Sequence, residues 1–128
     1  VIWCVFDRDD NTDEMLQKAK QLADRKTYRI AFSNPAFELW FLYHFKDQTA
    51  AVESSAAIVS MLKQADRLPD YKKNQDVYDK LLPLQQQAID RAKKQVKKRE
   101  ADGDDLFIRR SNPITTVVEL VEFLNSRK

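Results

Sequence analysis

The segment Val1–Asp10, VIWCVFDRDD, decides the fold prediction because six apolar residues run directly into acids placed two positions apart. Such a run is typical of a strand buried on both faces, as in a parallel sheet. Asp7 and Asp9 would then lie at the carboxyl end of this strand, where open α/β folds place their chemistry. Residues i and i+2 of an extended segment share a face, so the two carboxylates could bind one Mg²⁺ or Mn²⁺ ion.

Electrostatic repulsion favours this metal site. Two carboxylates about 4 Å apart, at an effective dielectric near 20, repel each other by about 4 kcal/mol, which a bound cation would offset. The alternative is that Asp9 or Asp10 caps the following helix and that the other acids of the segment are solvated.

Composition excludes several classes of protein. The 128 residues make one domain or part of one. The single glycine argues against the Gly-rich phosphate loops of P-loop and dinucleotide-binding proteins. The single cysteine, Cys4, permits neither an internal disulfide nor a zinc cluster and favours the reducing cytoplasm. No apolar run is long enough to cross a membrane, and the net charge of +2 neither requires nor excludes nucleic acid.

The next residues predict a β-α-β unit. Apolar residues at helical spacing indicate a helix over Asp13–Arg25, and Tyr28–Phe32 has the character of a second strand. A right-handed crossover with parallel pairing is expected for such a unit. Ser33-Asn34-Pro35 would end the second strand and open a buried helix over Phe37–Phe45. The predicted fold class is therefore α/β, with a parallel sheet flanked by helices.

A change of composition after this core indicates an α-helical insertion. Long Ala-, Gln- and Lys-rich stretches predict helices over Val52–Arg67 and Asp76–Glu100, broken at Pro69 and Pro83. A second Ser-Asn-Pro, residues 111–113, would open an amphipathic terminal helix. The predicted division is residues 1–47 as half of the core, 48–104 as the insertion, and 105–128 as the turn and helix that complete the core.

Several other residues are candidates for a site. Glu38, in the first turn of an apolar helix, is either a dipole-stabilising acid or a third metal ligand. The Ser-Asn-Pro turn at Ser33 and Asn34 could present backbone N–H groups to a phosphate, or it could be an ordinary helix cap. His44 could be a general base, although a packed histidine is the commoner case.

Basic residues form two further candidates for contact with phosphate or nucleic acid. Arg109 and Arg110 could clamp a phosphate or could simply be solvated. The span 91–99 carries six basic residues, and its candidate contacts are Lys94, Lys97 and Lys98. A solvated helix face is the favoured interpretation of this span, because no aromatic residues interleave with the charges.

Three blocks of the chain resemble the RloB-like family, which is similar to Toprim proteins. They are Val1–Asp10, the segment from Ser33-Asn34-Pro35 through His44-Phe45, and Asn112-Pro113 with Thr115-Thr116-Val117. The resemblance implies a Toprim-like core that binds Mg²⁺ and performs phosphodiester chemistry on DNA or RNA, with Asp7 and Asp9 as the metal pair. It also implies an ATPase partner and a role in restriction or antiviral defence.

The family's general acid/base glutamate, which follows the first Toprim strand, has no counterpart in this sequence. Since Val1 already lies inside the predicted strand, with no initiator Met or signal peptide, we expect a fragment that is catalytically poor by itself. Two other hypotheses stay open. One is a non-catalytic module that binds nucleic acid or an ATPase. The other is a phosphotransferase of the haloacid-dehalogenase kind, in which Asp-x-Asp supplies a nucleophile and an acid/base.

Overall fold

The computed structural model describes residues 1–128 and shows a small mixed sheet between helices. The strands, β1 (Trp3–Asp7), β2 (Arg29–Asn34) and β3 (Ile114–Thr115), lie in the order β1-β2-β3. β1 and β2 are parallel, whereas β3 is antiparallel to β2. The α/β class and the β-α-β unit are confirmed, but the all-parallel sheet is wrong because the chain returns along β2 in the opposite direction.

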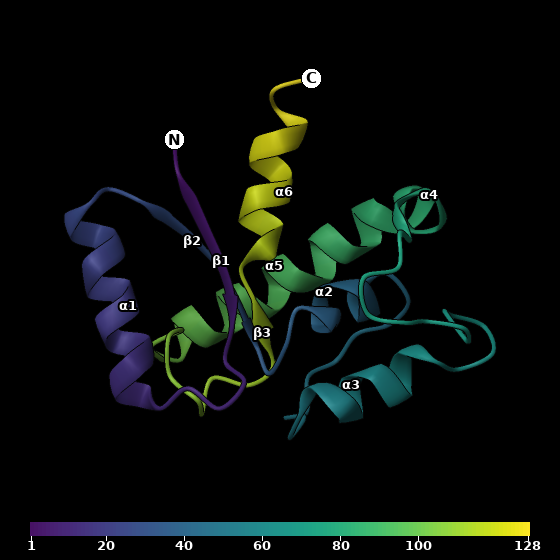
Figure 1. Ribbon diagram of the computed structural model, residues 1–128, viewed down its shortest axis with the longest axis horizontal. Coiled ribbons are helices and arrows are strands. Elements are labelled where there is room, and N and C mark those ends of the chain that lie inside the picture. The colour runs from purple at the N-terminus through teal and green to yellow at the C-terminus, as the bar shows by residue number, and fades with distance from the viewer.

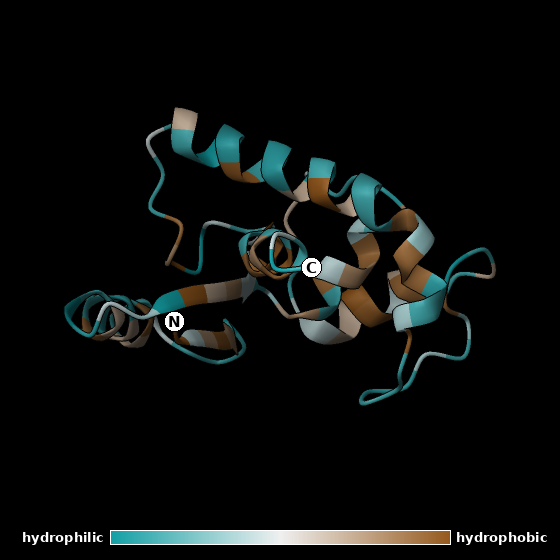
Figure 2. Cartoon of the chain, turned by 90° about the horizontal axis from the view of Figure 1, so that it is seen from above, coloured by the Kyte–Doolittle hydropathy of each residue, from teal (hydrophilic) through white to brown (hydrophobic).

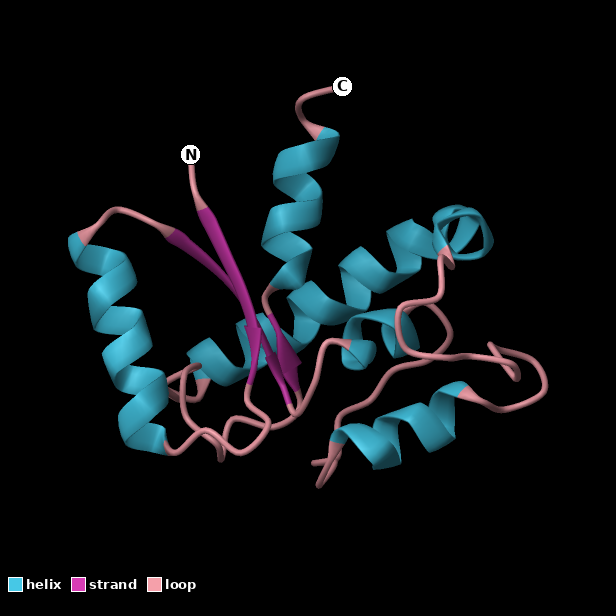
Figure 3. Ribbon diagram, in the orientation of Figure 1, coloured by secondary structure: helices cyan, strands magenta, loops and turns pink.

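Helices cover both faces of the sheet (Figure 1, Figure 3). α1 (Asp13–Arg25) packs on one face, where Leu16 and Ala23 meet Ile30 and Phe32 of β2. On the other face lie α2 (Glu38–Tyr43), α5 (Gln85–Ala101) and α6 (Val117–Asn125), which form the largest apolar cluster together with Ala31. The successive residues 30, 31 and 32 thus alternate between two cores, as the pleat of a strand requires.

The region between the sheet segments is helical, with shorter helices than the sequence predicts. It contains α3 (Ser55–Leu62), α4 (Tyr78–Leu81), the 3-10 turn η1 (Leu82–Leu84) and then α5. Pro83 lies inside η1, in agreement with the predicted break. The apolar side of α5 packs toward the sheet and α2, while its outer face is hydrophilic (Figure 2). The division into a core and an insertion stays a prediction.

β1 is an edge strand and is not buried on both faces. Val5, in the middle of this edge strand, is 51% exposed. Trp3, by contrast, packs against Phe123 of α6 with ring centroids 5.8 Å apart. The prediction of a doubly buried strand is therefore wrong, since an apolar run alone cannot distinguish an edge strand from a central one. No helix has the length and apolar character needed to span a membrane.

Buried polar side chains join the two ends of the fold. Asn34 Nδ2 donates to the carbonyl oxygens of Ile108, Arg109 and Ser111 at 3.1, 3.0 and 2.8 Å. Asn112 binds both backbone groups of Val52: its Oδ1 accepts from the Val52 N–H at 3.0 Å, and its Nδ2 donates to the Val52 oxygen at 2.6 Å.

The second Ser-Asn-Pro turn therefore does not open a helix. It leads into β3, and α6 begins only at Val117. Hydroxyl groups continue the contact between β2 and β3: Ser33 Oγ lies 2.8 Å from Thr115 Oγ1, and Thr116 Oγ1 accepts from the Phe32 N–H at 2.9 Å. We call these three hydroxyl side chains and the two asparagines the polar latch: Ser33, Asn34, Asn112, Thr115 and Thr116 with their backbone partners.

We predict that Asn112→Ala lowers the free energy of unfolding by about 2–4 kcal/mol, because it leaves a buried N–H and a buried C=O of Val52 without partners. Urea denaturation measures the change. Asn125→Ala is the matched control, since Asn125 makes one hydrogen bond, to Gln85, and is only half-buried. A loss for Asn112→Ala no larger than that of the control would contradict the proposed importance of the latch.

Candidate functional site

Asp7 lies where the sequence places it, at the carboxyl end of β1. It is the last residue of the strand, pairs in register with Ser33 of β2, and is half-buried. Its side chain lines a pocket of about 290 Å³ at this end of the sheet. The other residues that line this acidic pocket come from α2 and from the loop before α4: Phe37, Glu38, Phe41, Tyr71, Lys73, Asn74 and Gln75.

The surroundings of Asp7 disfavour its negative charge. Burial is the main cause that raises the pKa of the Asp7 carboxyl, and the neighbouring carboxylates of Asp9 and Glu38 raise it further. The backbone N–H of Phe37 and the ammonium group of Lys73 act in the opposite direction but are outweighed. A half-buried acid next to two other acids is the electrostatic condition that a bound divalent cation relieves.

Glu38 is held in the acidic pocket by a tyrosine. The residue is 5% exposed, and its Oε2 accepts a hydrogen bond of 2.8 Å from the hydroxyl group of Tyr71. Burial and this hydrogen bond raise the pKa of Tyr71 well above its ordinary value, so the hydroxyl keeps its proton and continues to donate. Glu38 lies in the first turn of α2, as predicted, and lines the same pocket as Asp7.

Asp9 does not join Asp7 and Glu38 in the acidic pocket. It adopts a positive φ of 40°, its side chain is exposed, and it does not line the pocket. Its backbone oxygen accepts from Arg8 Nε at 3.1 Å and from Arg109 Nη1 at 3.0 Å, which fixes this left-handed turn. The helix-cap alternative for Asp9 and Asp10 is wrong, because Thr12 caps α1 by accepting from the Met15 N–H.

The residues present fit a metal ion only in part. No three or more His, Cys, Asp or Glu side chains converge as a ligand set, so the predicted trio of Asp7, Asp9 and Glu38 is not assembled. Asp7 and Glu38 alone still suit a hard cation, because Mg²⁺ is commonly held by one or two carboxylates and keeps several waters. The candidate centre is thus a pair of carboxylates.

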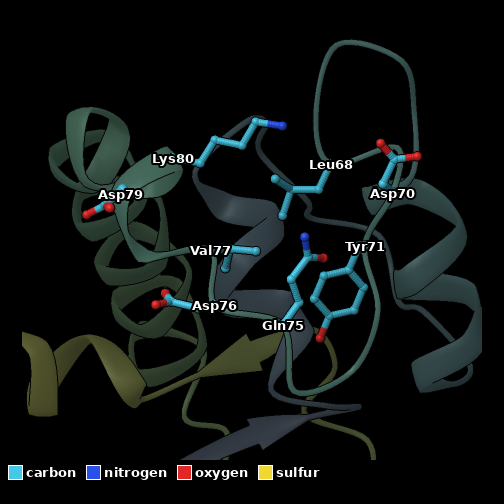
Figure 4. A pocket seen from close by; sticks show the side chains of 8 residues that line it. All are labelled: Leu68, Asp70, Tyr71, Gln75, Asp76, Val77, Asp79 and Lys80. Atoms are coloured by element: carbon cyan, nitrogen blue, oxygen red, sulfur yellow. The ribbon is translucent and has the colours of Figure 1, made fainter.

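The largest pocket, of about 330 Å³, adds no metal ligands to this pair. It lies beside the acidic pocket, with Tyr71 and Gln75 as common walls. Its three acids, Asp70, Asp76 and Asp79, stand at separate places on the rim and do not point toward one another (Figure 4).

The phosphate contact predicted for Ser33 and Asn34 is wrong in this structure. Both side chains are 0% exposed and belong to the polar latch, so no surface is left for a ligand. Neither caps α2, which begins after Phe37 and has no side-chain cap. The sequence of a short polar turn after a strand does not reveal its hydrogen-bond partners. They can be neighbouring backbone groups or, as here, groups 74–82 positions away.

Some of the predicted basic contact residues bind other groups of the protein, and the others are exposed to solvent. Arg109 Nη1 also donates to the Asn11 oxygen at 2.7 Å, so this residue holds the loop after β1, whereas Arg110 is exposed. Lys94 forms an ion pair with Asp47 at 3.0 Å. Lys97 and Lys98 are exposed and make no ion pair.

Three residues of this region escaped prediction. Tyr71 and Lys73 belong to an irregular loop more than 30 positions from Glu38, and no periodicity links them to the acids. Arg8 stands between Asp7 and Asp9 in sequence, yet it is 8% exposed and donates through Nη2 to the Glu53 oxygen at 2.7 Å. An arginine inside an acidic run was the only signal available for it.

Comparison with known proteins gives one match. The model of a family described as "RloB-like protein" matches residues 1–124. No curated protein and no solved structure matches the chain.

We predict that Asp7→Asn is more stable than the wild type at pH 7 without divalent cations. Because the pKa of Asp7 is raised in the folded state, the wild type loses stability as pH rises from the ordinary value of 3.8 through the folded value. The variant lacks this loss, so the two should converge below pH 3.8. Urea titrations at several pH values measure the difference, with the exposed Asp70→Asn as control. A wild type that is the more stable protein at pH 7 would contradict the raised pKa.

Proposed function

This chain belongs to the RloB-like family, and we propose that it carries the metal-binding part of a Toprim-like, Mg²⁺-dependent nuclease. The observation that supports the proposal is the pairing of two carboxylates, Asp7 and Glu38, in one pocket at the carboxyl end of a parallel strand pair. Other α/β proteins place phosphate chemistry at this end of the sheet.

The charged residues of the acidic pocket and Tyr71 each have a role in this proposal. Asp7 and Glu38 hold Mg²⁺ or Mn²⁺, and the Tyr71 hydroxyl fixes the orientation of Glu38. A cation bound here would stabilise charge on the scissile phosphate and lower the pKa of an attacking water. Lys73, exposed at the rim, attracts the phosphate to the pocket. Asp9 acts only through its charge, which raises the affinity of its neighbours for a cation.

The proposed substrate is DNA or RNA. Exposed basic side chains at Arg110, Lys97 and Lys98 could add contacts with the phosphate backbone. The cytoplasmic location, the ATPase partner and the role in restriction or antiviral defence are part of the same proposal, and the support for the last two is the family resemblance.

The two rival hypotheses are less well supported by the geometry. A haloacid-dehalogenase mechanism needs the second aspartate in the same pocket as the first, whereas Asp9 faces solvent outside it. A binding module that uses the basic helix would need its charges free. Four of the six basic residues in span 91–99 instead bind protein groups, namely Arg91, Lys93, Lys94 and Arg99.

We predict that the purified chain binds Mn²⁺ at one site and that Asp7→Asn or Glu38→Gln weakens this binding at least about tenfold, since each removes one of two charged ligands. Electron paramagnetic resonance measures free Mn²⁺ during a titration, and excess Mg²⁺ should compete. Asp102→Asn, an exposed change at the end of α5, is the matched control.

The same variants should then be compared in Mg²⁺-dependent cleavage of labelled DNA and RNA by the protein together with its ATPase partner. Unchanged Mn²⁺ affinity in both Asp7→Asn and Glu38→Gln would exclude the proposed centre, whatever the cleavage assay shows.

A further inference from the structure

A third pocket also adjoins the acidic pocket, and its lining is mostly hydrophobic. Its volume is about 260 Å³, and seven of its eleven lining residues are hydrophobic. Phe37, Phe41 and Gln75 line both pockets, so the two cavities share a wall. We call it the aromatic pocket; the rest of its lining is Trp40, His44, Asp76, Val77, Tyr78, Leu81, Leu82 and Gln85.

Most rings of this pocket belong to α2 and its flanking residues: Phe37 precedes the helix, Trp40 and Phe41 lie within it, and His44 follows it. Tyr78 adds a ring from α4. Phe37 meets Phe41 edge-to-face with centroids 5.3 Å apart, and Trp40 meets His44 in the same way at 5.0 Å. Edge-to-face pairing leaves ring faces that are not stacked on each other. Phe37 and Phe41 are only half-buried, so their remaining surface can contact a flat ligand.

His44 is one of four polar residues that line this cavity, together with Gln75, Asp76 and Gln85. The residue is 3% exposed, and its Nδ1 lies 2.9 Å from the Trp40 carbonyl oxygen. Because a carbonyl oxygen can only accept, Nδ1 carries the proton, which makes Nε2 an acceptor in the neutral ring. Nε2 has no protein partner and is not among the fully buried atoms that lack one, so it keeps access to a ligand.

The charge state of His44 agrees with this assignment. Burial is the main cause that lowers the pKa of the imidazole, and the charge of Arg91 lowers it further, against the effect of the Trp40 and Phe41 carbonyl groups. The ring is therefore neutral at pH 7, and an N–H donor on a ligand finds a free acceptor in the pocket.

We propose that the aromatic pocket binds one unpaired nucleobase of the nucleic acid whose phosphate lies in the acidic pocket. The inference rests on the proposed function for the position of the phosphate. The inference predicts a single-stranded or locally unpaired substrate. A base that is paired within a duplex cannot enter a cavity next to the pocket that holds its phosphate.

Three features favour a base over another occupant. The half-buried phenyl rings offer the aromatic surface on which unpaired bases stack. His44 Nε2 can accept a hydrogen bond from the amino group of adenine, cytosine or guanine. The wall shared with the acidic pocket places the cavity directly beside Asp7 and Lys73, as a base lies beside its own phosphate.

The test uses a fluorescent aminopurine base within a DNA oligonucleotide, presented single-stranded or paired in a duplex, with Ca²⁺ in place of Mg²⁺ to prevent cleavage. We expect the wild type to bind the single-stranded probe at least about tenfold more tightly than the duplex and to quench its fluorescence. Phe37→Leu should weaken single-strand binding by about tenfold, the usual effect of losing one stacking ring. His44→Phe should reduce affinity while keeping a flat ring.

Phe123→Leu is the matched control. Phe123 is a half-buried aromatic residue of α6 that packs against Trp3 of β1 and lies outside both pockets. Circular dichroism verifies that each variant is folded. Because Phe37 is only half-buried, we expect the fold to tolerate its replacement by leucine. Unchanged affinity and quenching in folded Phe37→Leu, or equal affinity for the single-stranded and duplex probes, would overturn the inference.

Asp7→Asn separates this inference from the proposed function. Loss of Mn²⁺ binding in Asp7→Asn together with unchanged probe quenching in Phe37→Leu would support the metal centre and overturn the base pocket. Unchanged Mn²⁺ binding in both Asp7→Asn and Glu38→Gln, with loss of quenching in Phe37→Leu, would overturn the metal centre and leave a base-binding pocket.

Discussion

The polar latch is the constraint on which the rest of the structure depends. The Nδ2 amide of Asn34 lies within hydrogen-bond distance of three carbonyl groups of the segment before β3, and Asn112 satisfies both backbone groups of Val52. These groups are buried, where each unpaired donor or acceptor costs about 1–3 kcal/mol. Of the latch side chains, only the Oδ1 atom of Asn34 is buried without a partner. A rearrangement of the chain would leave more of these groups unpaired, so the network favours one arrangement. It therefore fixes how the distant carboxyl-terminal segment returns to the sheet.

The acidic pocket is positioned by the same residues of β2. Ser33, whose hydroxyl group contacts Thr115, also pairs with Asp7 in register, and its carbonyl oxygen accepts from the Arg8 N–H at 2.8 Å. The Asp9 N–H donates to the Pro35 oxygen at 3.3 Å, so the turn after β1 follows the start of the segment that leads to α2. Asp7, at the end of β1, and Glu38, in the helix that follows β2, are thus both positioned by the carboxyl end of β2.

Local patterns in the sequence were sufficient for the β-α-β unit and for the position of Asp7. The apolar run, the helical spacing over residues 13–25 and the acids at the strand end are all features of neighbouring residues. The failures share a cause: Ser33 and Asn34 were interpreted through local partners, whereas their actual partners lie 74–82 positions away. The role of Tyr71 could not be predicted for the same reason, because its hydrogen bond to Glu38 depends on the path of an irregular loop.

The short helix α2 shows why the two proposed binding functions can be separated. Glu38 faces the acidic pocket, whereas Trp40 and His44 face the aromatic one, and Phe37 and Phe41 form the boundary between them. Affinity at the first depends on charge, so it falls with salt and with protonation of Asp7. Affinity at the second depends on ring surface and one neutral acceptor, which salt affects little. A single nucleotide combines a charged phosphate with a neutral aromatic base, and α2 with its flanking residues Phe37 and His44 separates the surfaces that suit each part.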